Sequence, residues 1–166
     1  MSGLPIYSTA VSPDWIDYNG HLRDAYYGLI VSLAIDAFMD RVGLDDGYRT
    51  RTHCTLYSLE MHVHFFREVK QTDTVDVSIR ILGTDHKRIH AALDVWSSRF
   101  PEPAASVEVM LLHVHQGHEP KSHPFPPEVT AALEKVAAQC AAGGPDFRGT
   151  GMNIPGSRRM ELRSRS

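Results

Sequence analysis

The residues best suited to chemistry stand close together, between Asp17 and His21. This short segment holds a carboxylate, the Asn19 amide, Gly20 and an imidazole, and a long apolar segment follows it. That apolar segment is predicted to be a helix, so its first turn offers unpaired backbone N–H groups and a positive partial charge. A carboxylate placed there can act as a nucleophile or a general base. We therefore predict that the active site lies here.

Each of these residues also has an ordinary structural role. Asp17 can simply cap a turn, and spacing alone supports this role as well as catalysis. Asn19 can be a turn residue, and His21 can hydrogen-bond the backbone. Gly20 is expected to supply a backbone conformation that other residues rarely adopt.

The predicted helix covers residues 24–42. Its polar or small residues recur every four positions, so they form one stripe and leave most of the circumference apolar. A helix of this kind must be buried on several sides, and Gly43 is expected to end it in a left-handed conformation. The stripe consists of Asp24, Gly28, Ser32, Asp36 and Asp40.

The rest of the chain can wrap this helix, because its hydrophobic period changes to two. The predicted fold class is α+β, with a curved antiparallel sheet of about five strands in meander order around the central helix. A terminal helix is expected at 128–142, and the polar segment 44–51 is predicted to be a loop. Strands are predicted at 5–12, 53–66, 73–82, 87–97 and 104–115. The second of these is expected to place Tyr57, Leu59, Met61, Val63 and Phe65 on one face.

Length and composition indicate one globular domain, residues 1–142, followed by a loosely ordered Gly/Pro/Arg-rich tail, 143–166. The net charge of −3 gives no reason to expect nucleic acid as a partner. Cys54 and Cys140 are expected to be free thiols in a reducing compartment. With no secretion signal recognised and three Asp residues in the central helix, we expect a cytoplasmic protein that does not enter the membrane.

The order of strand, loop, long helix and antiparallel strands resembles the hotdog fold over residues 5–140. The segment Asp17 to Leu22, followed by two tyrosines, resembles the 4-hydroxybenzoyl-CoA thioesterase branch of that superfamily. Residues 15–21 together with 85–90 are more similar to the betainyl-CoA thioesterases of bacterial carnitine degradation. The resemblance implies an acyl-CoA thioesterase that needs no cofactor and no metal. It also implies a homodimer or a dimer of dimers with each site at a subunit interface.

The same resemblance implies roles for the motif residues. Asp17 would attack the thioester carbonyl or activate water. Asn19 would hold the water or the carboxylate, and His21 would orient the loop or contact the thioester. The backbone N–H groups of Arg23 and Asp24 would form the oxyanion hole.

A quaternary ammonium acyl group would need anionic or aromatic contacts. The candidates are Trp15, Tyr18, Tyr26, Tyr27 and Glu60, although core packing would account for any one of the aromatic residues. Lys87 and Arg88, with Arg67 or Arg99, are candidates for binding the CoA phosphates. Exposed basic residues at the start of a strand are also common without such a role.

Other functions remain open from the sequence. His62 and His64 repeat the spacing of His113 and His115, a pattern that zinc sites can use but that lacks an evident third ligand. A hydratase or dehydratase acting on acyl thioesters would require an acid–base residue, for which His21 is the candidate. A non-catalytic acyl-CoA-binding module would keep the fold without turnover.

Overall fold

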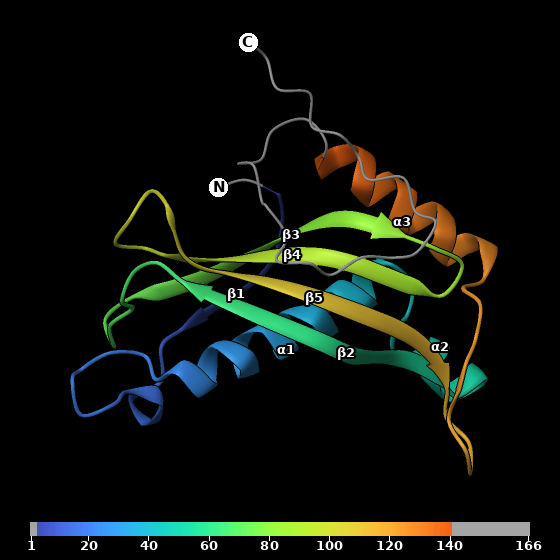
Figure 1. Cartoon of the computed structure of the whole chain (residues 1–166), viewed down its shortest axis with the longest axis horizontal. Helices are drawn as coiled ribbons and strands as arrows, with labels where there is room; N and C mark the ends of the chain where they lie inside the picture. The colour runs from blue at the N-terminus through green and yellow to red at the C-terminus, as the bar shows by residue number, and fades with distance from the viewer. Residues whose placement is uncertain (1–2, 141–166) are drawn as a thin grey trace.

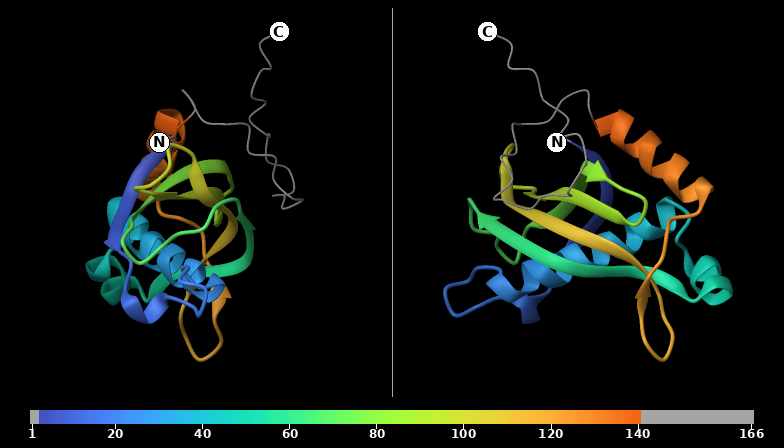
Figure 2. Two further views of the ribbon diagram at one scale, coloured as in Figure 1. Left: turned by 90° about the vertical axis from the view of Figure 1, so that its left-hand side faces the viewer. Right: turned by 45° about the vertical axis from the view of Figure 1, so that its right-hand side comes forward.

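A computed structural model describes residues 3–140 of the chain (Figure 1). A six-stranded antiparallel sheet curves round the long helix α1 (Asp24–Arg41), which lies on its concave face (Figure 2). The predicted α+β architecture is confirmed. The strands are β1 (Leu4–Ala10), β2 (Cys54–Phe65), β3 (Thr74–Thr84), β4 (Arg88–Ser97), β5 (Pro103–His115) and β6 (Lys121–Ser122), and the other α-helices are α2 (Asp46–Thr52) and α3 (Pro127–Cys140).

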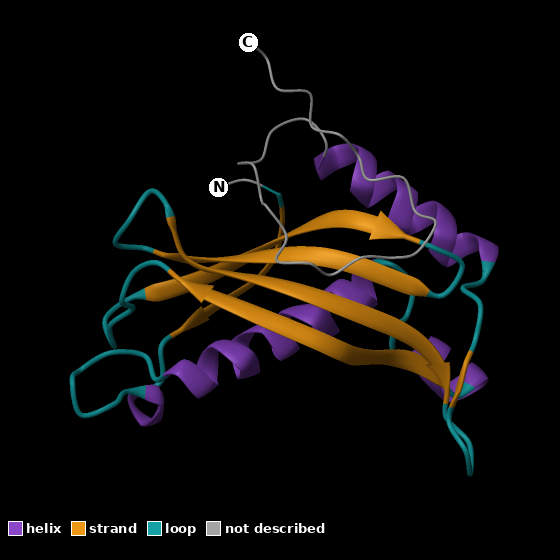
Figure 3. Ribbon diagram, in the orientation of Figure 1, coloured by secondary structure: helices purple, strands orange, loops and turns teal. Residues whose placement is uncertain are grey.

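The strand order is β1-β3-β4-β5-β2, and the short β6 pairs with β5. Only β3, β4 and β5 follow one another as the predicted meander. The prediction is wrong for β2, which lies at the opposite edge of the sheet from β1. Between them the chain runs through α1, which carries it across the concave face (Figure 3).

The sequence pattern of α1 explains its place under the sheet. The predicted polar stripe is exposed, except for Gly28, which is half-buried. After the helix, Gly43 has a φ of +87°, in agreement with the predicted left-handed end. The buried side chains that α1 contributes to the core are Tyr27, Ile30, Val31, Ala34, Ile35, Phe38 and Met39.

β2 does not keep the single alternation that was predicted for it. A bulge at Leu59 shifts its register with β5. Before the bulge Leu56 packs against the core, and after it Met61 does, whereas Tyr57 and Leu59 are exposed. The prediction that Tyr57 and Leu59 share the apolar face of Met61 is wrong, because one extra residue exchanges the two faces of a strand.

The segment 44–51 was predicted to be a loop, but most of it belongs to helix α2. The side chain of Asp45 caps this helix by accepting the Tyr48 N–H at 2.7 Å. Tyr48 is buried and its hydroxyl lies 3.0 Å from Nε2 of His113 on β5. A helix this short depends on such tertiary contacts, which local sequence does not reveal.

The terminal helix α3 packs against β3 and β1 and contributes Val129, Leu133 and Val136 to the core. The last two residues predicted for this helix, 141–142, and the predicted tail, 143–166, lie outside the described residues. Within the described residues, no helix is long and apolar enough to span a membrane.

Candidate functional site

A cavity of about 600 Å³ opens where the loop before α1 meets the end of β2. It brings the predicted catalytic segment together with residues that follow β2, more than forty positions later in the chain. The lining residues are Asp17, Tyr18, His21, Leu22, Arg23, Asp24, Tyr27, Phe65, Phe66, Arg67 and Glu68.

Backbone hydrogen bonds hold the catalytic loop in a closed turn. The Asp17 N–H donates to the His21 carbonyl at 2.8 Å, and the Gly20 N–H donates to the Asp17 carbonyl at 3.0 Å. Gly20 has a φ of +80°, the left-handed conformation expected for it. The Leu22 N–H donates to the Val69 carbonyl at 2.7 Å, which fastens the loop to the segment after β2.

The Asp17 carboxylate both caps this turn and retains capacity for a substrate. Its Oδ1 accepts the Asn19 N–H at 2.8 Å and the His21 N–H at 3.1 Å. Among the described residues, its Oδ2 has only the Asn19 side-chain amide, at 3.5 Å. Chiefly the His21 N–H, and then Asn19, hold the pKa of Asp17 below its usual range. Asp17 is therefore ionised at neutral pH, with one oxygen weakly engaged.

Among the described residues, the first turn of α1 leaves one backbone N–H without an acceptor. The Arg23 N–H donates to the Trp15 carbonyl at 2.9 Å, and the Ala25 N–H donates to Oδ1 of Asp24 at 2.8 Å. The Asp24 N–H has no acceptor among the described residues. Of the two predicted oxyanion donors, the structure thus leaves Asp24 available.

The predicted pocket aromatics divide into two pairs. Tyr18 and Tyr27 line the cavity, and burial raises the pKa of Tyr27 to about 12, with the nearby Asp73 charge as a second cause. Trp15 and Tyr26 do not line the cavity; they stack on each other with ring centres 5.7 Å apart and pack against the core.

The carboxylate that lines the cavity is Glu68, not the predicted Glu60. Glu60 lies on the exposed side of β2 and does not line the cavity, whereas Glu68 does. Phe66 lines it as well, and sequence reasoning missed both residues. Nothing in their local sequence marks them, because their position depends on how the end of β2 packs against the loop.

The predicted CoA-binding residues lie at two ends of the sheet. Arg67 lines the cavity and pairs with Glu102 at 3.1 Å. The start of β3 pairs with the end of β1, which leads into the catalytic loop (Figure 1). Lys87 and Arg88 follow the other end of β3, so they lie away from that loop. Arg88 is held by Asp85 at 2.6 Å. Within one chain, Lys87 and Arg88 do not reach the cavity.

The histidine pairs considered as a metal site are also separated. His62 and His64 pair with residues 108 and 106 of β5, whereas His113 and His115 pair with residues near the start of β2. Across residues 3–140, no group of three or more His, Cys, Asp or Glu side chains is arranged to hold a metal ion.

Comparisons with known proteins agree on one family. The family model described as the thioesterase-like superfamily matches residues 11–133. The chain is 41% identical over 153 residues to a betainyl-CoA thioesterase of Pseudomonas aeruginosa, covering 92% of this chain and 96% of that one. It is 34% identical to an L-carnitine dehydrogenase/betainyl-CoA thioesterase of Agrobacterium fabrum, over 90% of this chain and 30% of that longer protein. A solved Staphylococcus aureus protein in complex with CoA has a TM-score of 0.80 and 27% identity, over 93% of this chain and 98% of that chain.

Proposed function

Because the chain belongs to the thioesterase-like superfamily and has the hotdog fold, we propose that it hydrolyses the thioester of a small acyl-CoA, betainyl-CoA or one similar to it. One observation of the structure carries this proposal. Two residues line the same cavity: Asp17, an ionised carboxylate with a weakly engaged oxygen, and Asp24, whose backbone N–H has no acceptor among the described residues. These are the two groups that thioester hydrolysis needs, one for the carbonyl carbon and one for the carbonyl oxygen.

In the nucleophilic route, Oδ2 of Asp17 attacks the thioester carbonyl carbon. Negative charge develops on the carbonyl oxygen, and the Asp24 N–H stabilises it with the positive end of α1. Collapse of the tetrahedral intermediate breaks the C–S bond and expels the CoA thiolate, leaving a mixed anhydride on Asp17. Water then hydrolyses the anhydride to the free acid and restores the carboxylate.

In the general-base route, Oδ2 takes a proton from a water molecule that attacks the same carbon, and the Asn19 amide helps to hold that water. The lowered pKa of Asp17 keeps the carboxylate ionised at neutral pH, as both routes require. Mass spectrometry of rapidly quenched enzyme distinguishes the routes, since an acyl adduct on Asp17 forms only in the first.

We also propose that the protein works as a homodimer joined through β2. This twelve-residue strand ends the sheet, and its outer edge pairs with no described strand. It exposes Tyr57, Leu59 and Phe65, and an exposed apolar edge favours pairing with another strand. Because Phe65 also lines the cavity, the interface adjoins the site. The Lys87 and Arg88 that bind the CoA phosphates would then come from the second subunit.

The test is release of free thiol from a panel of thioesters: betainyl-CoA, short aliphatic acyl-CoAs and an aromatic acyl-CoA. We expect rapid cleavage of betainyl-CoA or a near relative, and loss of about a hundredfold or more in Asp17→Asn. If the wild-type protein cleaves none of them, the hydrolase proposal is wrong. If a β2-edge variant such as Leu59→Arg remains a dimer by light scattering, the proposed interface is wrong.

A further inference from the structure

The cavity is lined by exposed aromatic rings from the catalytic loop and from the end of β2. Phe65 and Phe66 are 53% and 58% exposed, and Tyr18 is 93% exposed. The ring of Tyr27 meets that of Phe65 edge to face, with centres 5.0 Å apart. Four aromatic rings thus line one cavity beside the catalytic loop. Large rings left exposed in a cavity indicate a ligand surface.

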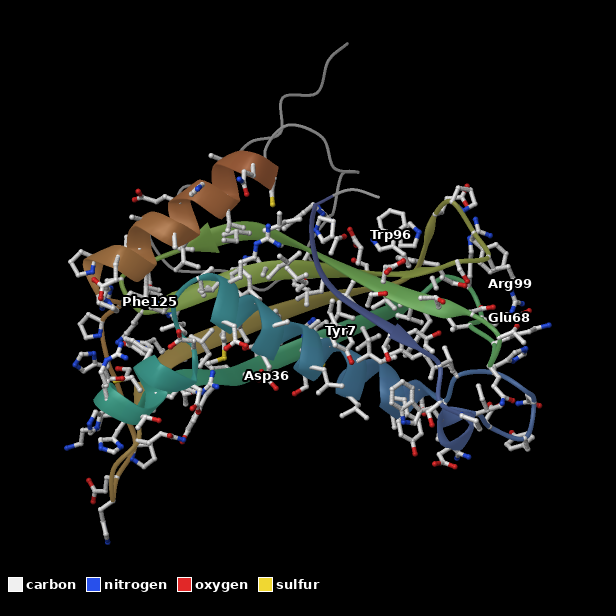
Figure 4. All side chains as sticks on the ribbon, turned by 180° about the vertical axis from the view of Figure 1, so that it is seen from behind. Tyr7, Asp36, Glu68, Trp96, Arg99 and Phe125 are labelled. Carbon is white, nitrogen blue, oxygen red and sulfur yellow. The ribbon has the colours of Figure 1, made fainter. Side chains whose placement is uncertain are left out.

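Glu68 brings a negative charge to the same cavity. Its side chain is 57% exposed, and among the described residues its one charged partner is Nε2 of His21, at 3.8 Å. The neighbouring Arg67 does not neutralise it, because Arg67 pairs with Glu102 at 3.1 Å and lies over the Phe100 ring at 5.2 Å. Figure 4 shows Glu68 at the end of the molecule where the catalytic loop lies.

Asp17 and Glu68 contact opposite ends of His21. The backbone N–H of His21 donates to Asp17, and its imidazole faces Glu68. Both carboxylates therefore contact the same histidine, and both line the cavity. This arrangement suits a small acyl group, with its carbonyl at Asp17 and its far end at Glu68.

We propose that Glu68 makes the site selective for an acyl group that carries a permanent positive charge close to its carbonyl. This inference rests on the proposed function and deepens it. The aromatic rings provide faces for the methyl groups of a quaternary ammonium ion, and Glu68 provides the opposite charge. A quaternary ammonium ion has no N–H to donate, so a carboxylate that lacks committed donors suits it. A neutral acyl group of equal size would cover the same carboxylate without compensating its charge.

The experiment compares two thioesters that differ by one charge. Betainyl-CoA carries a trimethylammonium group, and 3,3-dimethylbutanoyl-CoA has carbon in place of that nitrogen. Thiol release gives kcat and KM for each with wild type, Glu68→Gln and Glu68→Lys. We expect Glu68→Gln to lower kcat/KM about 30-fold for the cationic thioester and less than about threefold for the neutral one. Glu68→Lys should lower the cationic value further.

Two control measurements test whether the effect is specific to Glu68. Glu134→Gln, an exposed carboxylate on α3, makes the same charge change away from the cavity and should leave the ratio of the two kcat/KM values unchanged. Thermal unfolding should show that Glu68→Gln folds normally, as expected for a largely exposed side chain.

The proposal is overturned if Glu68→Gln leaves the ratio of the two kcat/KM values unchanged, whether or not both values fall. It is also overturned if Glu60→Gln, rather than Glu68→Gln, removes the preference for charge. Absence of thiol release from either thioester in the wild type would count against the proposed function instead. In that case the ratio of the two dissociation constants, measured by calorimetry for wild type and Glu68→Gln, still tests Glu68.

Discussion

Both ends of the curved sheet gather polar and aromatic side chains, but the two ends use them differently. At one end Asp17 and its neighbours line an open cavity. At the other, His113 is fully buried, with the Tyr48 hydroxyl 3.0 Å from its Nε2 and the His123 carbonyl 2.8 Å from its Nδ1. The ring of Phe125, which Figure 4 labels at that end, stacks on His113 with centres 5.0 Å apart.

The contacts of His113 determine its proton positions. A carbonyl oxygen only accepts, so Nδ1 of His113 carries the proton and Nε2 accepts the Tyr48 O–H. Burial lowers the pKa of His113, and the neutral ring is therefore the stable form. Both ring nitrogens are engaged within the protein, whereas Asp17 keeps one weakly engaged oxygen beside a cavity. The comparison shows that a residue is available for chemistry when its hydrogen-bonding capacity is not fully used inside the fold.

The largest expected effect follows from changing Asp17, at the end of the sheet that holds the cavity. Asp17→Asn should lower kcat for the preferred thioester by about a hundredfold or more, because the amide neither attacks the carbonyl nor takes a proton. Its oxygen can still accept the Asn19 and His21 N–H groups, so the thermal unfolding midpoint should stay close to that of the wild type. Thiol release and calorimetry measure the two quantities. Comparable activity in both proteins would show that Asp17 only caps the loop.

Changing His113, at the other end of the sheet, should lower stability and leave activity unchanged. His113→Ala removes a buried ring, opens a cavity and leaves the Tyr48 hydroxyl without its acceptor, at an expected cost of about 3 kcal/mol in unfolding free energy. Activity per folded molecule should be unchanged. His115→Ala, at the exposed end of the same strand, is the matched control and should change stability by about 0.5 kcal/mol or less. Urea unfolding measures both, and equal effects would show that the His113 contacts add nothing.

The sequence predicts one of these ends better than the other. The catalytic loop is a local structure, since the partners of Asp17 lie within four positions of it. Its residue types therefore suffice to predict the turn, and the pattern of α1 and the clean alternation of β3 predict the scaffold. His113 was considered only as a possible metal ligand, because its partner Tyr48 lies 65 positions away in the chain.

The same reasoning explains what was missed near the site. Glu68 and Phe66 reach the cavity only because β2 ends beside the loop. The bulge at Leu59 and the helix α2 depend on packing between segments, and neither leaves a periodic signal. Properties set by neighbouring residues were predictable from the sequence, and properties set by long-range contacts were not.

A smaller change tests the hydrogen bond alone. Tyr48→Phe keeps the ring but leaves Nε2 of His113 buried without a donor, which should cost about 1 to 2 kcal/mol in unfolding free energy. Tyr57→Phe, on the exposed part of β2, is the control and should be nearly neutral. Thermal and urea unfolding of the two variants give the comparison. Equal stability of both variants would mean that the Tyr48–His113 bond has no net value.

The pH dependence of stability should follow from the neutral state of His113. The folded protein holds this ring neutral below the ordinary histidine pKa of about 6.5, whereas the unfolded chain protonates it there. Unfolding then takes up a proton, so the folded state loses stability as the pH falls through that value. The contribution is at most about 0.7 kcal/mol between pH 7 and pH 6. Urea unfolding at both pH values should show a smaller pH dependence for His113→Gln than for the wild type, and an identical dependence would contradict the assignment.

The smallest expected effect concerns Lys87, which lies at the same end of the sheet as His113. Its side chain contacts Ser122 at 3.2 Å. If a second subunit brings Lys87 to the cavity, it meets the CoA phosphates and not the reacting carbonyl. Lys87→Gln should then raise KM for a CoA thioester about threefold and leave kcat unchanged, as expected for an exposed charge contact. The matching pantetheine thioester lacks the terminal nucleotide and should show no change, and Lys135→Gln on α3 is the control. A change in KM that is the same for both thioesters, or no change for either, would remove Lys87 from the CoA site and leave the two ends of the sheet functionally separate.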